Sequence, residues 1–399
     1  MNQMRNQTPP LPTLPIHLML SVCRWLSSPL GWQCVKSGLL PLNQGNHQHS
    51  QESEELRDAI LHEAKKRTSE MLSGVLRYYE TPYQRNVVEP PAIWQCGSAR
   101  LLDYGQKISN PKSIVLFIPS LINRYYILDL EEERSLLRYL ATQEIYPLVL
   151  DWGEPAEKEK DFSCGDYITE ILSPAIDFIA EISAQPIALA GYCMGGVLAM
   201  AAVKLKRKQI SSLALFATPW NFHCPEFSPF VLEEKWQVEI AQKIAAQKIL
   251  SANLIQSLFY LTDPFVFEHK FRRYYELEAG SHAARDFVAL EHWVNDGVAM
   301  TSAVANDCLI GWAQKNNLMN NNWLVAGKKI TPPPSSLPTF IAIPKNDHIV
   351  PFECAMPLAR KVKNAHVIHP SAGHVGMIIG SSAKRELWQP YAQWLLQSY

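Results

Sequence analysis

Residues 187–202 determine the architecture that we expect for the whole chain: Ile187-Ala188-Leu189-Ala190-Gly191-Tyr192-Cys193-Met194-Gly195-Gly196-Val197-Leu198-Ala199-Met200-Ala201-Ala202. The apolar run before Gly191 is typical of a buried parallel strand, and the small residues after Gly196 favour a helix. Between them, Gly191 and Gly195 flank Cys193 at the spacing of a nucleophile elbow. At such a turn the following helix dipole favours a thiolate. We therefore expect Cys193 to be a nucleophile.

The other seven cysteines carry no such signal. Free cysteines are usually buried and inert, and we expect these seven to be so. None of the eight stands in a C-x-x-C pair or at zinc-site spacing to histidine, so we expect no metal centre. No secretory leader precedes them, and a reducing cytoplasm is the expected location. The seven are Cys23, Cys34, Cys96, Cys164, Cys224, Cys308 and Cys354.

Length and charge limit the classes of protein to consider. The 399 residues can bury a large core, and the formal net charge of -1 gives no electrostatic reason to bind nucleic acid. Apolar runs alternate with helical patterns, as a mostly parallel sheet flanked by helices requires. The expected strands lie at 92–102 (a hairpin), 114–118, 146–150, 187–190, 213–217, 337–343 and 365–369, and the expected helices at 52–79, 130–142 and 165–184. The fold class is therefore α/β.

Four segments follow from this pattern. Residues 1–52 form an N-terminal extension and linker, and residues 53–220 form the first part of the sheet domain. Residues 221–330 form a helical insertion rich in aromatic residues and without strand alternation, and residues 331–399 complete the domain. The insertion is either a cap that excludes water from the active site or an ordinary helical core.

The extension contains an apolar stretch at residues 16–40. It is interrupted by Arg24, Pro29, Gly31 and Lys36, so it is not a transmembrane span. Its apolar residues 16–26 form either a surface-seeking helix or a helix docked on its own domain. The polar residues 43–52 are typical of a linker.

Two loops at strand ends supply the partners that a cysteine nucleophile needs. Asp347 follows the strand at 337–343, and His374 follows the strand at 365–369. Nucleophile, acid and base thus occur in the chain order of α/β-hydrolase enzymes. Taken singly, Asp347 could cap a turn and His374 could be an ordinary loop residue. As an ordered set they indicate that His374 is the base and Asp347 its acid partner, with His348 in a supporting role.

The oxyanion hole of such a site needs two backbone amides. One is that of Met194, the residue after the nucleophile. The second comes from the loop after the strand at 114–118, where Ser120, Leu121 and Ile122 are the candidates. The sequence alone does not choose among these three.

These features together resemble polyhydroxyalkanoate synthases, from about residue 85 to the end of the chain. The resemblance is to the short catalytic subunits, the class III type, because the N-terminal part is short and Trp293-Val294-Asn295-Asp296 has their Trp-x-x-Asp pattern. The motifs that carry it are Pro119-Ser120-Leu121-Ile122-Asn123-Arg124-Tyr125-Tyr126-Ile127-Leu128-Asp129-Leu130, Leu150-Asp151-Trp152-Gly153, Gly191-Tyr192-Cys193-Met194-Gly195-Gly196, Ala217-Thr218-Pro219-Trp220-Asn221-Phe222, Asp347-His348-Ile349-Val350-Pro351 and Gly373-His374-Val375-Gly376.

The resemblance implies an α/β-hydrolase fold with an inserted helical cap and an acyltransferase activity. The family polymerises (R)-3-hydroxyacyl-coenzyme A into polyester and releases coenzyme A, with the chain carried on the residue that is Cys193 here. In the family the aspartate that is Asp347 here is also proposed to help activate the 3-hydroxyl. The resemblance implies no cofactor, a non-catalytic synthase subunit as a partner, a homodimer or hetero-oligomer, and a place at the surface of cytoplasmic polyester granules.

Three alternatives remain open at this stage. A thiol-dependent hydrolase, either an acyl-coenzyme A thioesterase or an intracellular polyester depolymerase, would use the same residues with water as acceptor. A granule-binding protein without activity would keep the elbow but release no coenzyme A. A membrane-tethered protein would be carried down with lipid through residues 16–40.

Overall fold

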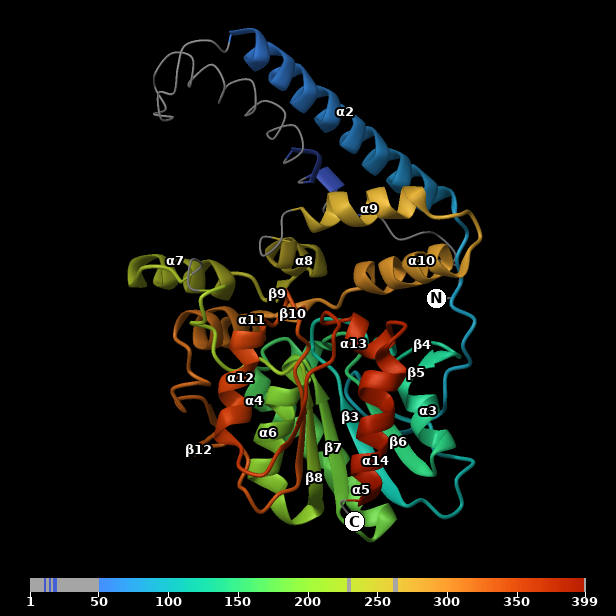
Figure 1. Ribbon diagram of the computed structural model, residues 1–399. Coiled ribbons are helices and arrows are strands. Elements are labelled where there is room, and N and C mark those ends of the chain that lie inside the picture. The colour runs from blue at the N-terminus through green and yellow to red at the C-terminus, as the bar shows by residue number, and fades with distance from the viewer. Residues whose placement is uncertain are drawn as a thin grey trace. The chain divides into compact units, whose positions relative to one another are not determined.

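The computed structural model describes residues 11, 14–15, 17–19, 50–227, 231–260 and 265–397 (Figure 1). The described residues form two compact units. The smaller unit joins the residues up to Gln84 with Gln256–Asn295, and the larger joins Arg85–Ile255 with the residues from Asp296 onward. Apart from residues 17–19 and 50–52, the apolar stretch at 16–40 and the linker at 43–52 lie outside the described residues.

An eight-stranded sheet forms the centre of the larger unit, and Figure 1 labels its middle strands β6, β3, β7 and β8. The full spatial order is β1-β2-β6-β3-β7-β8-β13-β14. β2 runs antiparallel to both of its neighbours, and the pairs from β6 to β14 are all parallel. The mostly parallel sheet expected from the sequence is therefore confirmed. The strands are β1 (Ala92–Cys96), β2 (Ala99–Asp103), β3 (Ser113–Ile118), β6 (Ile145–Asp151), β7 (Ile187–Tyr192), β8 (Ile210–Phe216), β13 (Thr339–Ala342) and β14 (His366–Ile368).

Helices bury both faces of this sheet. Successive side chains of a strand point to opposite faces. Phe117 of β3 and Phe216 of β8 contact the ring of Tyr391 on α14 (Gln389–Gln397), with ring centroids 6.3 and 5.0 Å apart. Their sequence neighbours Leu116 and Leu215 belong instead to the core cluster that contains the side chains of α6 (Met194–Lys206). Burial on two faces explains why these strands are continuously apolar.

The helices of the larger unit differ locally from expectation. The helix expected at 130–142 begins only at Leu136, because Ser135 is its N-cap and its side chain accepts the Arg138 amide; residues before it form the short strands β4 (Asp129–Glu131) and β5 (Arg134–Ser135). The helix expected at 165–184 is a short α-helix, a π-helical turn and a longer α-helix. The helices are α3 (Leu136–Thr142), α4 (Cys164–Asp166), α5 (Ser173–Ser183), α7 (Glu234–Ala245), α11 (Ser302–Asn306), α12 (Phe352–Lys361) and α13 (Gly376–Ile379). Turns of 3₁₀- or π-helix lie at Tyr125–Leu128, Glu157–Glu159, Tyr167–Leu172, Arg207–Gln209, Asp307–Gln314 and Lys384–Trp388.

The insertion at 221–330 contains strands that the sequence did not predict. β9 (Ile249–Leu250) pairs antiparallel with β10 (Met300–Thr301), and β11 (Leu324–Val325) pairs with β12 (Lys328–Lys329). Each strand has two residues, which is too short to produce an alternation signal. The first pair brings the two ends of residues 251–299 together.

The smaller unit packs a long helix against two others. α2 (Ser50–Glu80), expected at 52–79, contacts α9 (Val266–Glu276), and α10 (His282–Asn295) adds Ala284 and Val288 to their common core. The division between the units falls within α8 (Ala252–Tyr260), after Ile255. A Cβ atom on Gly74 would lie 2.1 Å from the Phe271 carbonyl oxygen, so the two helices approach too closely for any other residue there. Among the described helices, none is both long and apolar enough to span a bilayer.

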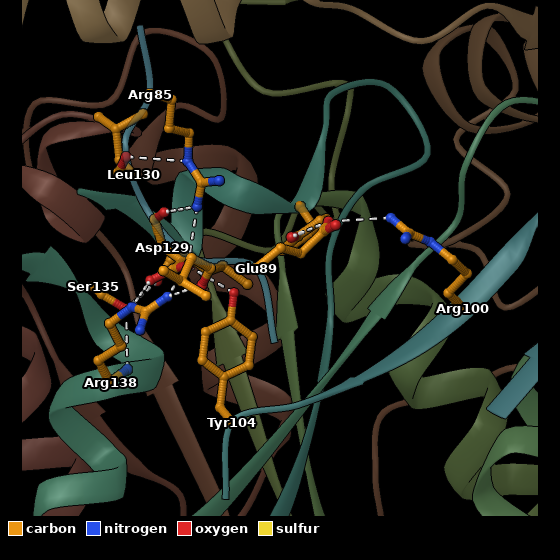
Figure 2. A network of polar contacts seen from close by, with 11 residues as sticks. Arg85, Glu89, Arg100, Tyr104, Asp129, Leu130, Ser135 and Arg138 are labelled. Atoms are coloured by element: carbon orange, nitrogen blue, oxygen red, sulfur yellow. Dashed lines mark hydrogen bonds and ion pairs between the residues drawn. The ribbon is translucent and has the colours of Figure 1, made fainter. Parts of the chain in front are cut away.

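A buried carboxylate holds the chain that follows β3. Asp129 is fully buried and accepts hydrogen bonds from Arg85 (3.0 Å), Arg138 (2.7 Å) and the hydroxyl of Tyr104 (2.8 Å). Figure 2 shows these three side chains converging on Asp129, while Arg85 also donates to the Leu130 carbonyl at 3.3 Å. Burial, together with the charges near it, raises the pKa of Tyr104, which stays a donor. The network therefore fixes the far end of the segment that starts at Ser120.

Candidate active site

Cys193 lies at a strained turn between β7 and α6. Its backbone angles are φ 57° and ψ −126°, a region that costs a residue other than glycine about 1–3 kcal/mol. Two hydrogen bonds hold it there: the Cys193 amide donates to Phe216 of the neighbouring strand at 2.8 Å, and its carbonyl accepts from the Gly196 amide at 3.0 Å. The side chain is partly exposed. The turn thus presents the thiol at the N-terminus of a helix, where the dipole favours negative charge.

Both flanking glycines are required by close packing. A Cβ atom on Gly191 would lie 2.4 Å from the Gly196 Cα, and one on Gly195 would lie 1.9 Å from the Ile118 carbonyl oxygen. Real Cβ atoms do not approach so closely, so the elbow spacing inferred from the sequence reflects contact. The second distance also shows that the end of β3 packs directly against the elbow.

His374 and Asp347 form a buried pair beside the elbow. The Nδ1 atom of His374 lies 2.7 Å from the Oδ2 atom of Asp347. The other carboxylate oxygen accepts the amides of Ile349 and Val350, at 2.8 Å each. Asp347 follows β13 and His374 follows β14, so both come from the same edge of the sheet as Cys193. The structure therefore brings together the three residues that the sequence singled out.

The charges of this group favour a protonated imidazole. Burial lowers the pKa of His374, but the charge of Asp347 and that of a Cys193 thiolate outweigh burial and raise it to about 10. A hydrogen bond between the Cys193 and His374 side chains acts in the same direction. The arrangement therefore keeps the imidazole of His374 protonated near neutral pH, beside the cysteine at the elbow.

Tyr192 is a further residue of the site, and the sequence reasoning missed it. Its buried hydroxyl donates to the His374 carbonyl at 3.2 Å, and its ring lies 5.1 Å from the imidazole, tilted by 33°. Tyr192 thereby ties the loop of the base to the residue before the nucleophile. Its place next to Cys193 was the only available signal, because the contact joins loops far apart in sequence.

The candidate oxyanion amides lie around the contact between β3 and the elbow. Met194 is the first residue of α6, where amides lack partners within the helix. Leu121 and Ile122 follow β3, and the Ile122 amide has a long hydrogen bond of 3.4 Å to Ser120 Oγ. The pairing of these amides around a substrate oxygen stays a prediction.

His348 lies in the loop of Asp347 but its side chain is exposed. Both carboxylate oxygens of Asp347 already have partners, so the supporting role expected of His348 stays a prediction. Within the described part of the chain, no group of three or more histidine, cysteine or acidic side chains is placed to hold a metal ion.

The sheet order, the strained elbow and the position of the acid and base after the last strands define an α/β-hydrolase fold, as the sequence indicated. The chain is similar in sequence to proteins named poly(3-hydroxyalkanoate) polymerase, which confirms the resemblance to this family inferred from its motifs. A family model described as the N-terminus of poly-beta-hydroxybutyrate polymerase (PhaC) matches residues 92–140.

Three curated relatives are each named poly(3-hydroxyalkanoate) polymerase subunit PhaC. The one from Haloferax mediterranei is 27% identical over 329 residues, which cover 80% of this chain and 66% of the relative. The one from Haloarcula marismortui is 28% identical, over 70% of this chain and 60% of the relative. The one from Synechocystis sp. is 23% identical, over 84% and 92%. The chain thus spans less than two thirds of the first two relatives.

Solved structures with a similar fold include an esterase from Thermogutta terrifontis, with a TM-score of 0.45 and 16% identity over 79% of this chain and 99% of the esterase. A thioesterase domain from the curacin biosynthetic pathway has a TM-score of 0.47 and 15% identity, over 78% of this chain and 100% of the domain.

Proposed function

We propose that this chain polymerises (R)-3-hydroxyacyl-coenzyme A into polyhydroxyalkanoate through an acyl group bound to Cys193. The observation that carries the proposal is the buried His374–Asp347 pair beside a cysteine at a nucleophile elbow. The names of the relatives supply the product class, and the substrate class is the one implied by the family resemblance of the motifs. A thiol nucleophile suits this chemistry, because its exchange with a thioester forms a bond of the same type as the one that breaks.

In the first step, the Cys193 thiolate attacks the thioester carbonyl of the substrate. The carbonyl carbon to coenzyme A sulfur bond breaks, and the proton held on His374 passes to the departing thiolate. The products are an acyl-Cys193 thioester and free coenzyme A. The Met194 amide, with that of Leu121 or Ile122, would stabilise the oxyanion, and we favour Leu121 because the Ile122 amide already has Ser120 as partner.

In the second step, a hydroxyl attacks the acyl-Cys193 thioester and forms the ester bond. His374 takes the hydroxyl proton and the cysteine leaves as a thiolate. Asp347 has one oxygen on His374 and the other on two amides, which supports a role in orienting the imidazole rather than in contacting the hydroxyl directly. Exclusion of water at this stage decides between polymer and free hydroxy acid.

The test measures coenzyme A release from (R)-3-hydroxybutyryl-coenzyme A and analyses the product. The proposal predicts release with polymer by the wild type, loss of both in Cys193→Ala, and retention of both in Cys96→Ala, which alters another partly exposed free cysteine. Release of free hydroxy acid would identify the thiol-dependent hydrolase instead. No release by the wild type, alone and with a synthase subunit of a relative added, would contradict the proposal.

The partner and the location are part of the same proposal. We infer that the chain works with a non-catalytic synthase subunit, as a homodimer or hetero-oligomer, at the surface of cytoplasmic polyester granules. Light scattering after size exclusion measures the oligomer, and sedimentation with isolated granules measures the location. If the chain is a monomer and polymerises at full rate alone, the inference that it needs a partner subunit is wrong.

A further inference from the structure

An apolar hollow lies in the larger unit, beside the loop that follows β3. The free space inside it is small, about 10 Å³ or roughly the room of one water molecule, within about 250 Å³ that includes open solvent. Segments far apart in the sequence form its walls: Leu121, then Trp152, Gly153 and Pro155, then Tyr167, and finally residues 298–301 with Val304. The reaction steps proposed above give this hollow no role.

Pro119 connects the hollow to the elbow. A Cβ atom on Gly195 would lie 2.8 Å from the Pro119 carbonyl oxygen, which accepts the indole N–H of Trp152 at 3.0 Å. Trp152 then lines the hollow, together with Leu121, whose amide is our favoured oxyanion donor. A thioester carbonyl bound at that amide would therefore have its own acyl group next to the hollow.

The walls of the hollow are fastened to one another. Asn123 forms a β-bridge with Gly297, and the Val298 amide donates to the Ile122 carbonyl at 3.0 Å. Just outside, Arg124 binds Glu154 at 2.6 Å and lies 3.5 Å from Asp296. Each of the three segments at the rim is thus tied to another, so the walls of the hollow are held in place.

The chemistry of the lining suits an alkyl group. The N–H of Trp152 is taken by Pro119, and the Thr301 hydroxyl donates to the Phe162 carbonyl at 2.6 Å. The remaining wall includes Leu121, Val298, Met300 and Val304, whose side chains offer only apolar surface. Burial of methylene groups against such surface is favourable.

We propose that this hollow binds the alkyl substituent on carbon 3 of the hydroxyacyl group and that Met300 limits the length it accepts. The inference rests on the proposed function and names the subsite that selects among its substrates. Met300 is buried, and its long unbranched side chain occupies space that a shorter residue would release.

The test compares kcat/KM for (R)-3-hydroxyoctanoyl- and (R)-3-hydroxybutyryl-coenzyme A. Met300→Ala should raise the ratio of octanoyl to butyryl at least about tenfold, because one methylene in an apolar pocket is worth about 10–200-fold. Met319→Ala makes the same change at a partly buried methionine outside the hollow and should leave the ratio unchanged. Ala299→Leu fills the hollow and should lower the ratio, which keeps the test available if Met300→Ala does not fold.

A wild type that turns over both substrates, with equal ratios in the Met300→Ala, Ala299→Leu and Met319→Ala variants, would overturn the inference and leave the proposed function standing. If the wild type releases no coenzyme A, calorimetric titration of the Cys193→Ala chain with octanoyl-coenzyme A separates the two ideas. Tighter binding on adding Met300→Ala then supports the subsite although the function has failed. Unchanged binding overturns it.

Discussion

The backbone of Cys193 is strained, and hydrogen bonds from its neighbours hold it in that conformation. Its positive φ is tolerated because Phe216 and Gly196 hold its amide and carbonyl, so the thiol is fixed before any substrate arrives. His374 is fixed in the same way from two sides, by Asp347 on its ring and by Tyr192 on its carbonyl. Preorganisation of this kind reduces the rearrangement that the reaction needs.

The charge of Asp347 should set the alkaline limit of activity. In the proposed mechanism His374 holds a proton for the departing coenzyme A. Burial lowers the pKa of His374, but the charge of Asp347, together with that of Cys193, outweighs burial and raises the pKa to about 10. Asp347→Asn should therefore move the alkaline limb of kcat/KM from near pH 10 toward the ordinary histidine value of about 6.5. The pH profile of coenzyme A release measures this.

Glu353→Gln is the control, because Glu353 is an exposed acid that follows in the next helix, α12. It should leave the limb in place. An unchanged limb in Asp347→Asn would mean that His374 does not carry the proton.

At this scale the sequence predicted the grouping of Cys193, Asp347 and His374, because motif spacing and chain order are local signals. It did not predict the tie from Tyr192, since that hydrogen bond joins positions separated by 182 residues. Motif spacing also does not show that both carboxylate oxygens of Asp347 take part in hydrogen bonds.

Among the elements, the segment from β3 to α3 depends most on one buried charge. The side chain of Asp129 is 0% exposed, and its partners Arg85 and Arg138 are 21% and 31% exposed. Asp129→Asn removes the charge but keeps the shape, and leaves two guanidinium groups without their anion. Breaking a buried pair in this way costs about 3–5 kcal/mol. Because both arginines are partly exposed to solvent, we expect the loss of unfolding free energy to lie at the lower end of that range.

The measurement is urea unfolding followed by tryptophan fluorescence. Asp177→Asn is the matched control: Asp177 binds Lys206 at 2.6 Å but is 47% exposed, so its loss should cost less than about 1 kcal/mol. Equal shifts of the unfolding midpoint in the two variants would show that the Asp129 network does not stabilise the segment.

The elements themselves were predicted to different degrees. The buried strands were visible as continuous apolar runs, and α2 was visible as a long amphipathic pattern. The start of α3 was not, because Ser135 caps the helix while the residues before it have the same composition as a first helical turn. The pairs β9–β10 and β11–β12 depend on partners distant in sequence and have no local period.

For the whole molecule, the raised pKa of His374 predicts that stability depends on pH. The folded chain keeps this proton up to about pH 10, whereas the unfolded chain releases it near 6.5. The contribution is therefore complete below pH 6.5 and is lost as the pH rises toward 10. His374→Gln should flatten the fall of the unfolding free energy in this window, measured by urea titrations at several pH values.

His366→Gln, at an exposed histidine of β14, should leave the slope unchanged. If the wild type and His374→Gln show the same slope, the proton is not held more tightly in the folded chain.

The division into two units could not be predicted from the sequence. α2 packs on α9 through residues such as Glu70 and Arg272, which lie 2.9 Å apart in space and 202 positions apart in the chain. The apolar face of α2 indicates only that a partner exists. The strand pattern, in contrast, specifies the sheet of the larger unit nearly completely.

The pairing of β9 with β10 makes residues 251–299 a cassette, since the polypeptide departs and returns at a single stem. Closure entropy grows only with the logarithm of length, and doubling such an excursion costs about 0.6 kcal/mol. Insertions in the loops between the helices of the cassette are therefore cheap in entropy, whereas α9 and α10 must be kept because they share a core with α2. The stem keeps the register of Met300 and its neighbours whatever the length of those loops.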